Sequence, residues 1–179
     1  MRWAAAAACL LSFTSGPPMG AGEGEAMAFE LTSSAFVPGQ ALPPRHTCDA
    51  QDLSPHLVWT DPPAGTASFA LIVEDPDAPM GTWIHWAIYD IPPDSRGLPE
   101  GVAPLETLPD GARHGVNDFG RVGYGGPCPP PGNPHRYFFR LYALDSKIGL
   151  PPRVPKPQLL KAIHAHTLGE ARLMGTYGR

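Results

Sequence analysis

Four runs of apolar and β-branched residues along the chain have the length of β-strands. Leu53 to Thr60 ends at a turn rich in proline and glycine, and Ser68 to Glu74 is an unbroken apolar run that suits the interior of a sheet. Trp83 to Ile91 is rich in aromatic and β-branched residues, and Tyr137 to Leu144 is a fourth run. The pattern predicts a chain that is mainly β.

The last part of the chain shows helical spacing of apolar residues first and strand-like alternation afterwards. Pro157 to Ala165 carries apolar residues at helical spacing, with its proline in the first turn, where proline is tolerated. From Glu170 to Tyr177, mostly polar side chains alternate with mostly apolar or small ones, which fits a closing strand. Several strands joined by turns, with one or two short helices near the C-terminus, favour an antiparallel β-sandwich.

Composition adds a domain count and excludes one class of partner. The 179 residues include 24 prolines and 20 glycines, with 42% hydrophobic and 17% charged residues, which indicates one globular, turn-rich domain over residues 29–179. The net charge of −4 gives no reason to expect nucleic acid as a partner. The stretch from Asp94 to Asn133 is crowded with glycine and proline, and loops of that length are usually functional.

The first 28 residues have the layout of a cleaved secretory signal. Arg2 supplies a positive charge, Trp3 to Phe13 is a short apolar run, and Ala26 to Ala28 offers a cleavage site before Phe29. The apolar run is too short to span a bilayer comfortably. We therefore expect an exported protein, periplasmic or secreted, without a transmembrane anchor.

Export changes the interpretation of the cysteines. Removal of the signal leaves Cys48 and Cys128, an even pair in an oxidising compartment. They can form a disulfide or remain two isolated thiols, and the sequence leaves both alternatives open. The sequence holds no closely spaced cysteine pair, so a cysteine metal site is not expected.

Two segments with unusual residue choices lie at strand ends near the middle of the chain. Asp75 to Pro79 follows the apolar run directly, and its two prolines stiffen the turn that aims the carboxylates. In the next strand, side-chain alternation places His85 on one face with Trp83, Ala87 and Tyr89. Taken alone, the first segment is typical of an ordinary turn and His85 of a hydrogen-bonded core histidine.

A third such segment is the loop from Gly125 to Tyr137. It is rigid, and it runs directly into a strand in which His135 and Tyr137 share a face while Arg136 points the other way. Glycine before proline, at Gly126, lets the backbone approach a ligand closely. Alone, this loop is typical of a stiff connector.

Together, the order and residue types of these segments resemble the phosphatidylethanolamine-binding protein family, also called the Raf kinase inhibitor protein-like family, in its bacterial branch. The resemblance covers nearly all of residues 29–179. It includes Phe29 to Ser33, Leu53 to Trp59, Asn117 to Gly120 and Gly123 to Gly126. It implies a large antiparallel sheet packed on a smaller one, with a pocket at one end.

The resemblance also implies a ligand-binding site. Asp75 would be its carboxylate, and the other residues that the resemblance assigns to it are Pro79, Trp83, His85, Gly126, Pro127, His135 and Tyr137. The backbone at Gly126 would supply an N–H or a surface of close approach. In this family the pocket accepts phosphate-like anions and phospholipid head groups, so we expect a non-enzymatic binding protein that needs no cofactor.

Two other functions remain open. The chain could inhibit a protease or a kinase through the rim of the pocket, since relatives act in this way. Alternatively, Asp75, His85 and His135 could form a metal site of two histidines and one carboxylate in a hydrolase, although the chain contains neither Gly-x-Ser-x-Gly nor His-Glu-x-x-His. The remaining loop histidines, His46 and His114, are expected at the surface.

Overall fold

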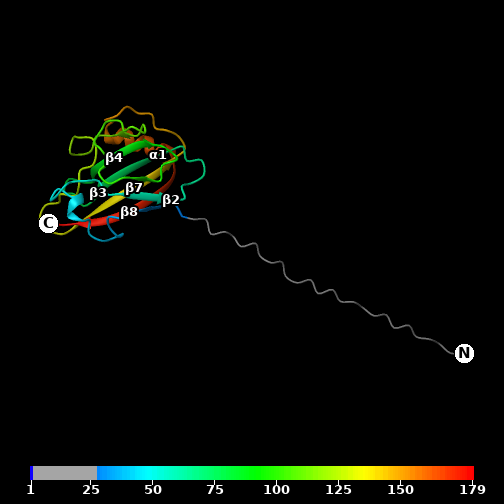
Figure 1. Cartoon of the computed structure of the whole chain (residues 1–179), viewed down its shortest axis with the longest axis horizontal. Helices are drawn as coiled ribbons and strands as arrows, with labels where there is room; N and C mark the ends of the chain where they lie inside the picture. The colour runs from blue at the N-terminus through cyan, green and yellow to red at the C-terminus, as the bar shows by residue number, and fades with distance from the viewer. Residues whose placement is uncertain (2–27) are drawn as a thin grey trace.

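A computed structural model describes Met1 and residues 28–179, which fold into two antiparallel sheets and one α-helix (Figure 1). The proposed signal segment lies outside the described residues, apart from its two ends. The small sheet has the strand order β1-β2-β5 and the large sheet the order β6-β4-β3-β7-β8. The elements are β1 (Glu30–Thr32), a short 3-10 helix (Pro44–His46), β2 (Leu57–Thr60), β3 (Ser68–Asp75), β4 (Trp83–Ile91), β5 (Gly97–Leu98), β6 (Arg113–His114), β7 (His135–Leu144), α1 (Lys156–His166) and β8 (Thr167–Tyr177).

This architecture confirms the predicted fold class, and the differences lie at element ends and in three short strands, β1, β5 and β6, that the pattern does not predict. β2 begins at Leu57 rather than Leu53, because Pro55 cannot donate to a strand ladder. β7 begins two residues early, at His135, and β8 begins at Thr167, directly after α1. The long loop holds the two-residue strands β5 and β6, which carry too few residues to show a period.

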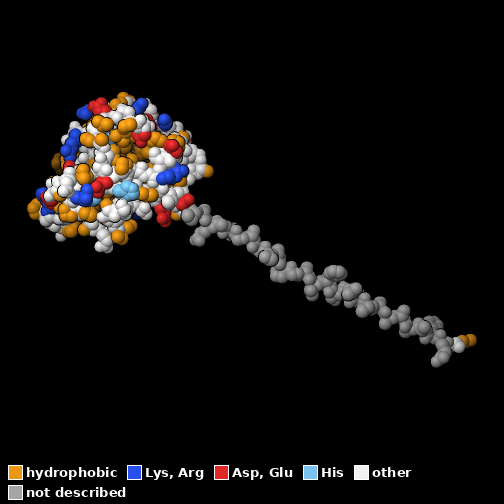
Figure 2. Space-filling view, viewed as in Figure 1, with side chains coloured by type: hydrophobic (Ala, Val, Ile, Leu, Met, Phe, Trp, Pro, Cys, Tyr) orange, Lys and Arg blue, Asp and Glu red, His pale blue; other side chains and the backbone are white. Residues whose placement is uncertain are grey.

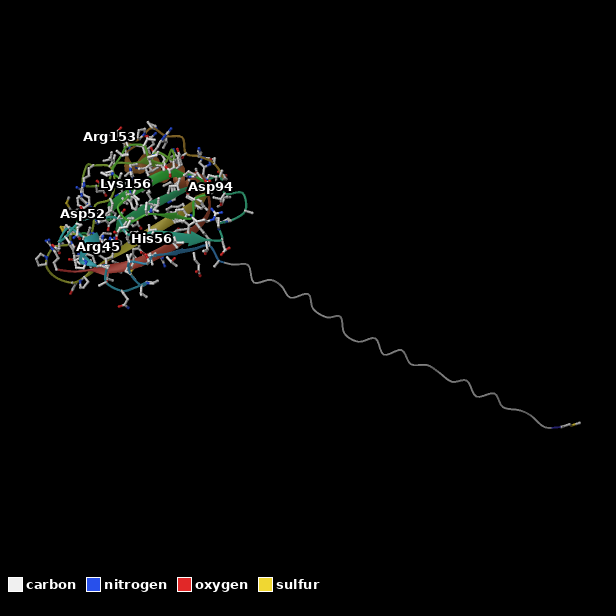
Figure 3. All side chains as sticks on the ribbon, in the orientation of Figure 1. Arg45, Asp52, His56, Asp94, Arg153 and Lys156 are labelled. Carbon is white, nitrogen blue, oxygen red and sulfur yellow. A yellow bond between two sulfur atoms is a disulfide. The ribbon has the colours of Figure 1, made fainter. Side chains whose placement is uncertain are left out.

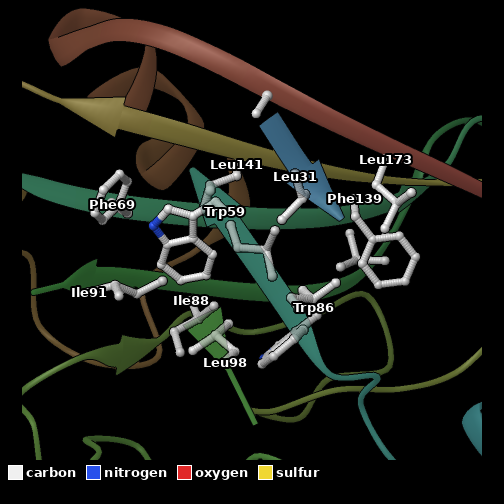
Figure 4. Close-up of a cluster of buried hydrophobic side chains, with 14 of the residues drawn as sticks. Leu31, Trp59, Phe69, Trp86, Ile88, Ile91, Leu98, Phe139, Leu141 and Leu173 are labelled. Carbon is white, nitrogen blue, oxygen red and sulfur yellow. The ribbon is translucent and has the colours of Figure 1, made fainter. Parts of the chain in front are cut away.

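The main core fills the space between the two sheets. Leu31, Trp59 and Leu98 project from the small sheet toward Phe69 and Phe139 of the large sheet (Figure 4). The rings of Trp59 and Phe69 lie 5.3 Å apart, in the range where aromatic pairs attract each other beyond simple burial. This layer fixes the spacing of the sheets and therefore the position of the strand ends.

A second core lies on the opposite face of the large sheet, beneath α1. Leu159 and Ile163 of the helix, four residues apart, pack with Ala87 and Tyr89 of β4. α1 begins after Pro155 and contains Pro157 in its first turn, as the sequence predicts. The large sheet is thus covered on both faces, which explains why β3 is continuously apolar from Phe69 to Val73.

A β-bulge in β4 changes the predicted faces of this strand. Val73 pairs with Trp86 but Glu74 pairs with Ile84, so His85 is an extra residue. His85 therefore faces the cavity described below, whereas Ala87 and Tyr89 belong to the core beneath α1. The expected shared face of His85 with Ala87 and Tyr89 is wrong, because alternation resets at the bulge.

The expectation that His46 and His114 lie at the surface is also wrong. Both are buried, with 1% and 0% of their surface exposed. Each ring donates its Nδ1 proton to a loop carbonyl, of Leu53 and of Leu105 respectively. They therefore hold loops in place from the inside, a use of histidine that leaves no periodic signal in the sequence.

The surface carries charge of both signs. Figure 2 shows Lys and Arg side chains interspersed with Asp and Glu over the described part of one face. Within residues 28–179, the only α-helix is far too short to cross a bilayer.

Candidate functional site

A cavity of about 320 Å³ opens where β3, β4 and β7 meet the proline-rich loop before β7. Asp75 ends β3, Trp83 and His85 lie at the start of β4, and His135 and Tyr137 lie at the start of β7. The strands are antiparallel neighbours, so these ends meet at one edge of the large sheet. The complete lining is Asp75, Ala78, Pro79, Met80, Trp83, His85, Phe119, Cys128, Pro129, Pro130, His135 and Tyr137.

Asp75 is buried, and neighbours occupy both of its carboxylate oxygens. Its Oδ1 accepts the backbone N–H of Asp77 at 2.8 Å, which closes the turn after β3. Its Oδ2 accepts a hydrogen bond from Nδ1–H of His135 at 2.8 Å. Because a carboxylate only accepts, Nδ1 of His135 carries the hydrogen and Nε2 remains available for a ligand. Asp75 therefore positions His135 rather than offering a free oxygen.

Next to this pair, Arg136 is held outside the cavity by Asp77. Two guanidinium nitrogens and the backbone N–H of Arg136 donate to the Asp77 carboxylate, at 2.7 to 2.9 Å. These hydrogen bonds lower the pKa of Asp77 to about 2. Arg136 thus points away from His135 and Tyr137, as the predicted alternation requires.

His85 is buried and oriented by the loop that follows Phe119. Its Nδ1 lies 2.6 Å from the carbonyl oxygen of Gly125, so Nδ1 donates and Nε2 is again unprotonated in the neutral ring. Burial lowers the pKa of His85, and the charge of Asp75 opposes this only in part.

The Tyr137 hydroxyl is the unsatisfied group of this site. The side chain is 1% exposed, and among the described residues no partner lies within hydrogen-bonding geometry of its oxygen. Burial raises the pKa of Tyr137 above its ordinary value, and the Asp75 carboxylate adds to the shift through its charge and as an acceptor that the hydroxyl approaches without meeting hydrogen-bonding geometry. The ring packs edge-on against His85 at 5.2 Å, so the tyrosine and the imidazole fix each other.

Gly126 and Pro127 do not line the cavity, unlike the other six residues that the sequence assigned to the site. The Gly126 N–H donates to Oδ1 of Asp52 at 2.6 Å, so it is not free for a ligand. A Cβ on Gly126 would lie 2.4 Å from the carbonyl oxygen of His46. Gly126 therefore anchors the loop through its hydrogen bond to Asp52 (labelled in Figure 3), which belongs to a segment far away in the sequence.

Lys156 and Asp118 fix the other wall. The Lys156 ammonium donates to Asp118 and to the carbonyl of Thr82, and Asp118 accepts the N–H of Ile84 at 2.6 Å. Lys156, labelled in Figure 3, begins α1. This contact ties the helix to the start of β4 and places Phe119 against the rings of Trp83 and His85.

Cys48 and Cys128 are joined by a disulfide, with their Cα atoms 5.4 Å apart. Cys128 lines the cavity, and both cysteines are exposed. The N–H of Cys48 donates to the carbonyl of Pro127 at 3.1 Å, so a backbone contact accompanies the covalent link. The segment after Thr47 therefore supports the wall of the cavity that contains Pro129 and Pro130.

Sequence reasoning missed half of the lining. Met80 and Phe119 lie far apart in the chain, and both are exposed, at 93% and 41% of their surface. Single exposed apolar residues are common and carry no signal by themselves. The other missed residues are Ala78, Cys128, Pro129 and Pro130, whose position depends on how the loops fold back.

Within residues 28–179, no group of three or more His, Cys, Asp or Glu side chains is arranged to hold a metal ion. Asp75, His85 and His135 thus lie around one cavity without forming the donor set that the hydrolase alternative requires. Nδ1 of each histidine is already used by a protein acceptor.

We expect the stability of the protein to fall as the pH drops below about 6.5, the ordinary pKa of histidine. Burial lowers the pKa of both His85 and His114 in the folded protein. In this window the unfolded chain binds protons that the folded chain does not, so the free energy of unfolding decreases as pH falls through it. Urea unfolding across this range measures the slope, and His114→Gln should make it shallower. A slope unchanged by that substitution would remove His114 from the explanation.

Comparisons with known proteins show which family the chain belongs to. A family model described as phosphatidylethanolamine-binding protein matches residues 32–178. A UPF0098 protein of Methanothermobacter thermautotrophicus is 51% identical over 149 residues, 83% of this chain and 98% of the relative. UPF0098 protein YbhB of Escherichia coli is 38% identical over 156 residues, 83% of this chain and 99% of the relative.

Solved structures show the same fold. The crystal structure of E. coli YbcL, called a new member of the mammalian PEBP family, has a TM-score of 0.80 and 35% identity, covering 84% of this chain and 98% of that one. CT736 of Chlamydia trachomatis, called a PEBP homologue, has a TM-score of 0.77 and 41% identity, covering 85% and 98%. The chain therefore belongs to the phosphatidylethanolamine-binding protein family.

Proposed function

We propose that this protein binds a small phosphate-like anion, free or as a phospholipid head group, in the cavity between His85 and His135, without catalysing a reaction. The observation that carries the proposal is the buried Tyr137 hydroxyl, which has no hydrogen-bond partner among the described residues. A buried hydroxyl without a partner costs free energy, and a ligand oxygen at this place would recover it.

Binding should be coupled to proton uptake. Nε2 of His85 and Nε2 of His135 are acceptors while the rings are neutral, because each Nδ1 proton is donated to the protein. An anion therefore needs protonated imidazoles, or must bring its own proton on a P–OH group. In both cases affinity should fall as pH rises. Asp75 supplies one negative charge against two imidazolium charges, so the fully protonated site is net positive.

The apolar wall limits where the anion can sit. Proline, methionine and aromatic side chains make up most of the lining, and the polar groups are confined to the strand ends. This separation of polar from apolar side chains supports a ligand whose charged end contacts Tyr137 and whose remaining part lies against Trp83 and Phe119. Pockets of this type take their orientation from a few polar contacts.

The proposal is tested by NMR titration with inorganic phosphate and with phosphoethanolamine, at about pH 5.5 and about pH 7.5, on either side of the ordinary histidine pKa. We expect shifts confined to the cavity residues and stronger at the lower pH. His135→Ala should abolish them, whereas His164→Ala, at an exposed position on α1, should not. No shift at either pH with millimolar ligand would refute the anion pocket.

Tyr137→Phe should raise stability and lower affinity together. Removing the unpartnered hydroxyl relieves a desolvation cost, which we expect to add about 1 kcal/mol to the free energy of unfolding. Losing its hydrogen bond to the anion should weaken binding about tenfold, the equivalent of about 1.4 kcal/mol. Urea unfolding and ligand titration of the same variant measure both effects. A destabilised variant with unchanged affinity would assign the hydroxyl a structural role.

The exposed apolar rim favours a second candidate, inhibition of a protease or a kinase by contact around the cavity mouth. Met80 and Phe119 are 93% and 41% exposed and line the same cavity, so two large exposed apolar side chains lie at one place on the surface. Met80→Ala, which removes apolar contact area and adds no charge, should weaken such inhibition far more than it weakens phosphoethanolamine binding. Loss of both would place the effect on the cavity itself.

Two features support export as part of this proposal. The first 28 residues have the composition of a secretory signal. The Cys48–Cys128 disulfide belongs to a class of bond that persists in oxidising compartments. Expression of the full chain, followed by fractionation and N-terminal sequencing, tests this. A protein that remains uncleaved in the cytoplasm would contradict export.

A further inference from the structure

We propose that the Cys48–Cys128 bond is a site of thiol–disulfide exchange with a dithiol reductant, and that its reduction releases the wall of the cavity. The consequence for ligand binding rests on the function proposed above. The exchange itself does not depend on it. Three observations carry the inference: the exposure of both cysteines, a cation beside both sulfurs, and the place of Cys128 in the cavity lining.

An attacking thiolate can reach this bond in the folded protein. Both Cys48 and Cys128 are exposed, and exposed disulfides are more easily reduced than structural ones. Cys128 also borders the cavity mouth, so the bond is accessible without separation of the sheets. Reactivity of this kind depends on access and on the stability of the departing thiolate.

Arg179 supplies that stability. Its Nη1 lies 3.7 Å from the sulfur of Cys48 and 3.7 Å from the sulfur of Cys128, so either sulfur can leave next to a positive charge. The opposing group is Asp49, whose Oδ1 lies 3.9 Å from the Cys48 sulfur, but its carboxylate is engaged by Arg179 and by the hydroxyl of Tyr177. A nearby arginine lowers the pKa of a cysteine thiol and so favours its departure.

The reaction consumes one dithiol for each bond. A thiolate of the reductant attacks one cysteine sulfur, the S–S bond breaks, and the other cysteine leaves as a thiolate that takes up a proton. The second thiol of the reductant then attacks the mixed disulfide. The products are Cys48 and Cys128 thiols and the oxidised, disulfide form of the reductant, so two electrons pass to the protein.

Reduction should loosen the proline-rich wall rather than the sheets. The loop before β7 is held by the disulfide, by the Cys48 N–H on Pro127, and by Arg179, whose guanidinium donates to Pro129 and whose carbonyl accepts the N–H of Gly132. The two contacts of Arg179 lie beside the disulfide, so we expect them to shift when the bond is broken. The strand pairs β3–β4 and β3–β7 make no use of either cysteine.

The first test follows reduction of the native protein by dithiothreitol, through alkylation and mass spectrometry. We expect reduction without denaturant, slowed about threefold or more in Arg179→Met, which retains the disulfide but loses the charge. Arg179→Lys should keep the rate, and Arg172→Met, on the outer face of β8, is the matched control. Unchanged or faster reduction in Arg179→Met would overturn the role of Arg179. Reduction that proceeds only at the rate of global unfolding would overturn the exchange site.

The second test compares NMR spectra of the oxidised and reduced protein. We expect shifts at the amides of Cys48, Cys128, Gly132 and Asn133, with the sheet amides unchanged, and phosphoethanolamine affinity lowered about tenfold on reduction. Global unfolding on reduction, or unshifted loop amides, would make the disulfide a structural staple and overturn the release of the wall. If the oxidised protein binds no phosphoethanolamine, the proposed function fails, while the exchange rates and loop shifts still decide this inference.

Discussion

Replacing Cys48 and Cys128 together by serine should lower the free energy of unfolding by about 4 kcal/mol, because the bond closes a loop with a sequence separation of 80 residues. The cross-link removes conformations from the unfolded chain, and that restriction is lost in the variant. This is a large part of the total stability of an ordinary domain, about 5–15 kcal/mol. Urea unfolding of the oxidised protein and of the double variant gives the difference.

The control separates the cross-link from the side chains. Wild-type protein with both thiols reduced and alkylated by a small reagent should lose a similar amount, since its chain is equally free. Asn133→Ala, an exposed position in the same loop, should change stability by less than about 0.5 kcal/mol. A double variant as stable as the wild type would show that the unfolded chain keeps these segments together without the bond.

Gly126→Ala should reduce stability by about 3 kcal/mol or more and disable the cavity at the same time. The added Cβ would lie 2.4 Å from the carbonyl oxygen of His46 and 2.8 Å from the Cα of Thr47, and backbone atoms cannot move aside as a flexible side chain can. Relief requires moving the loop, which breaks the Gly126 hydrogen bond to Asp52 and shifts the carbonyl of Gly125 away from His85.

Two measurements check this prediction. Urea unfolding gives the loss of stability, and NMR titration shows whether the His85 ring keeps its bonded tautomer. Asp52→Ala is the matched comparison, because it removes the hydrogen bond without adding volume and should cost less than Gly126→Ala. An alanine variant with wild-type stability would mean that the segment around His46 and Thr47 can yield by several tenths of an ångström.

The sequence predicted the strand content because the apolar runs are long and their neighbours are strong turn residues. Ser68–Glu74 and Trp83–Ile91 became β3 and β4 with an error of at most one residue at each end. β1, β5 and β6 were missed, since two or three residues cannot display a period and their pairing depends on β2 and β4. The face of His85 within β4 was mispredicted for the same reason: a bulge is defined by a partner strand.

For the site, the sequence by itself placed its residues at strand ends to within two residues: Asp75 at the end of β3, Trp83 and His85 at the start of β4, and His135 and Tyr137 at the start of β7. Local rules suffice there, because alternation and turn chemistry act within a few residues. Tertiary structure alone decided that the Gly126 N–H donates to Asp52 and that Phe119 and Met80 line the cavity. Those contacts join segments many residues apart, and their geometry is set by packing between sheets and loops, which no local pattern encodes.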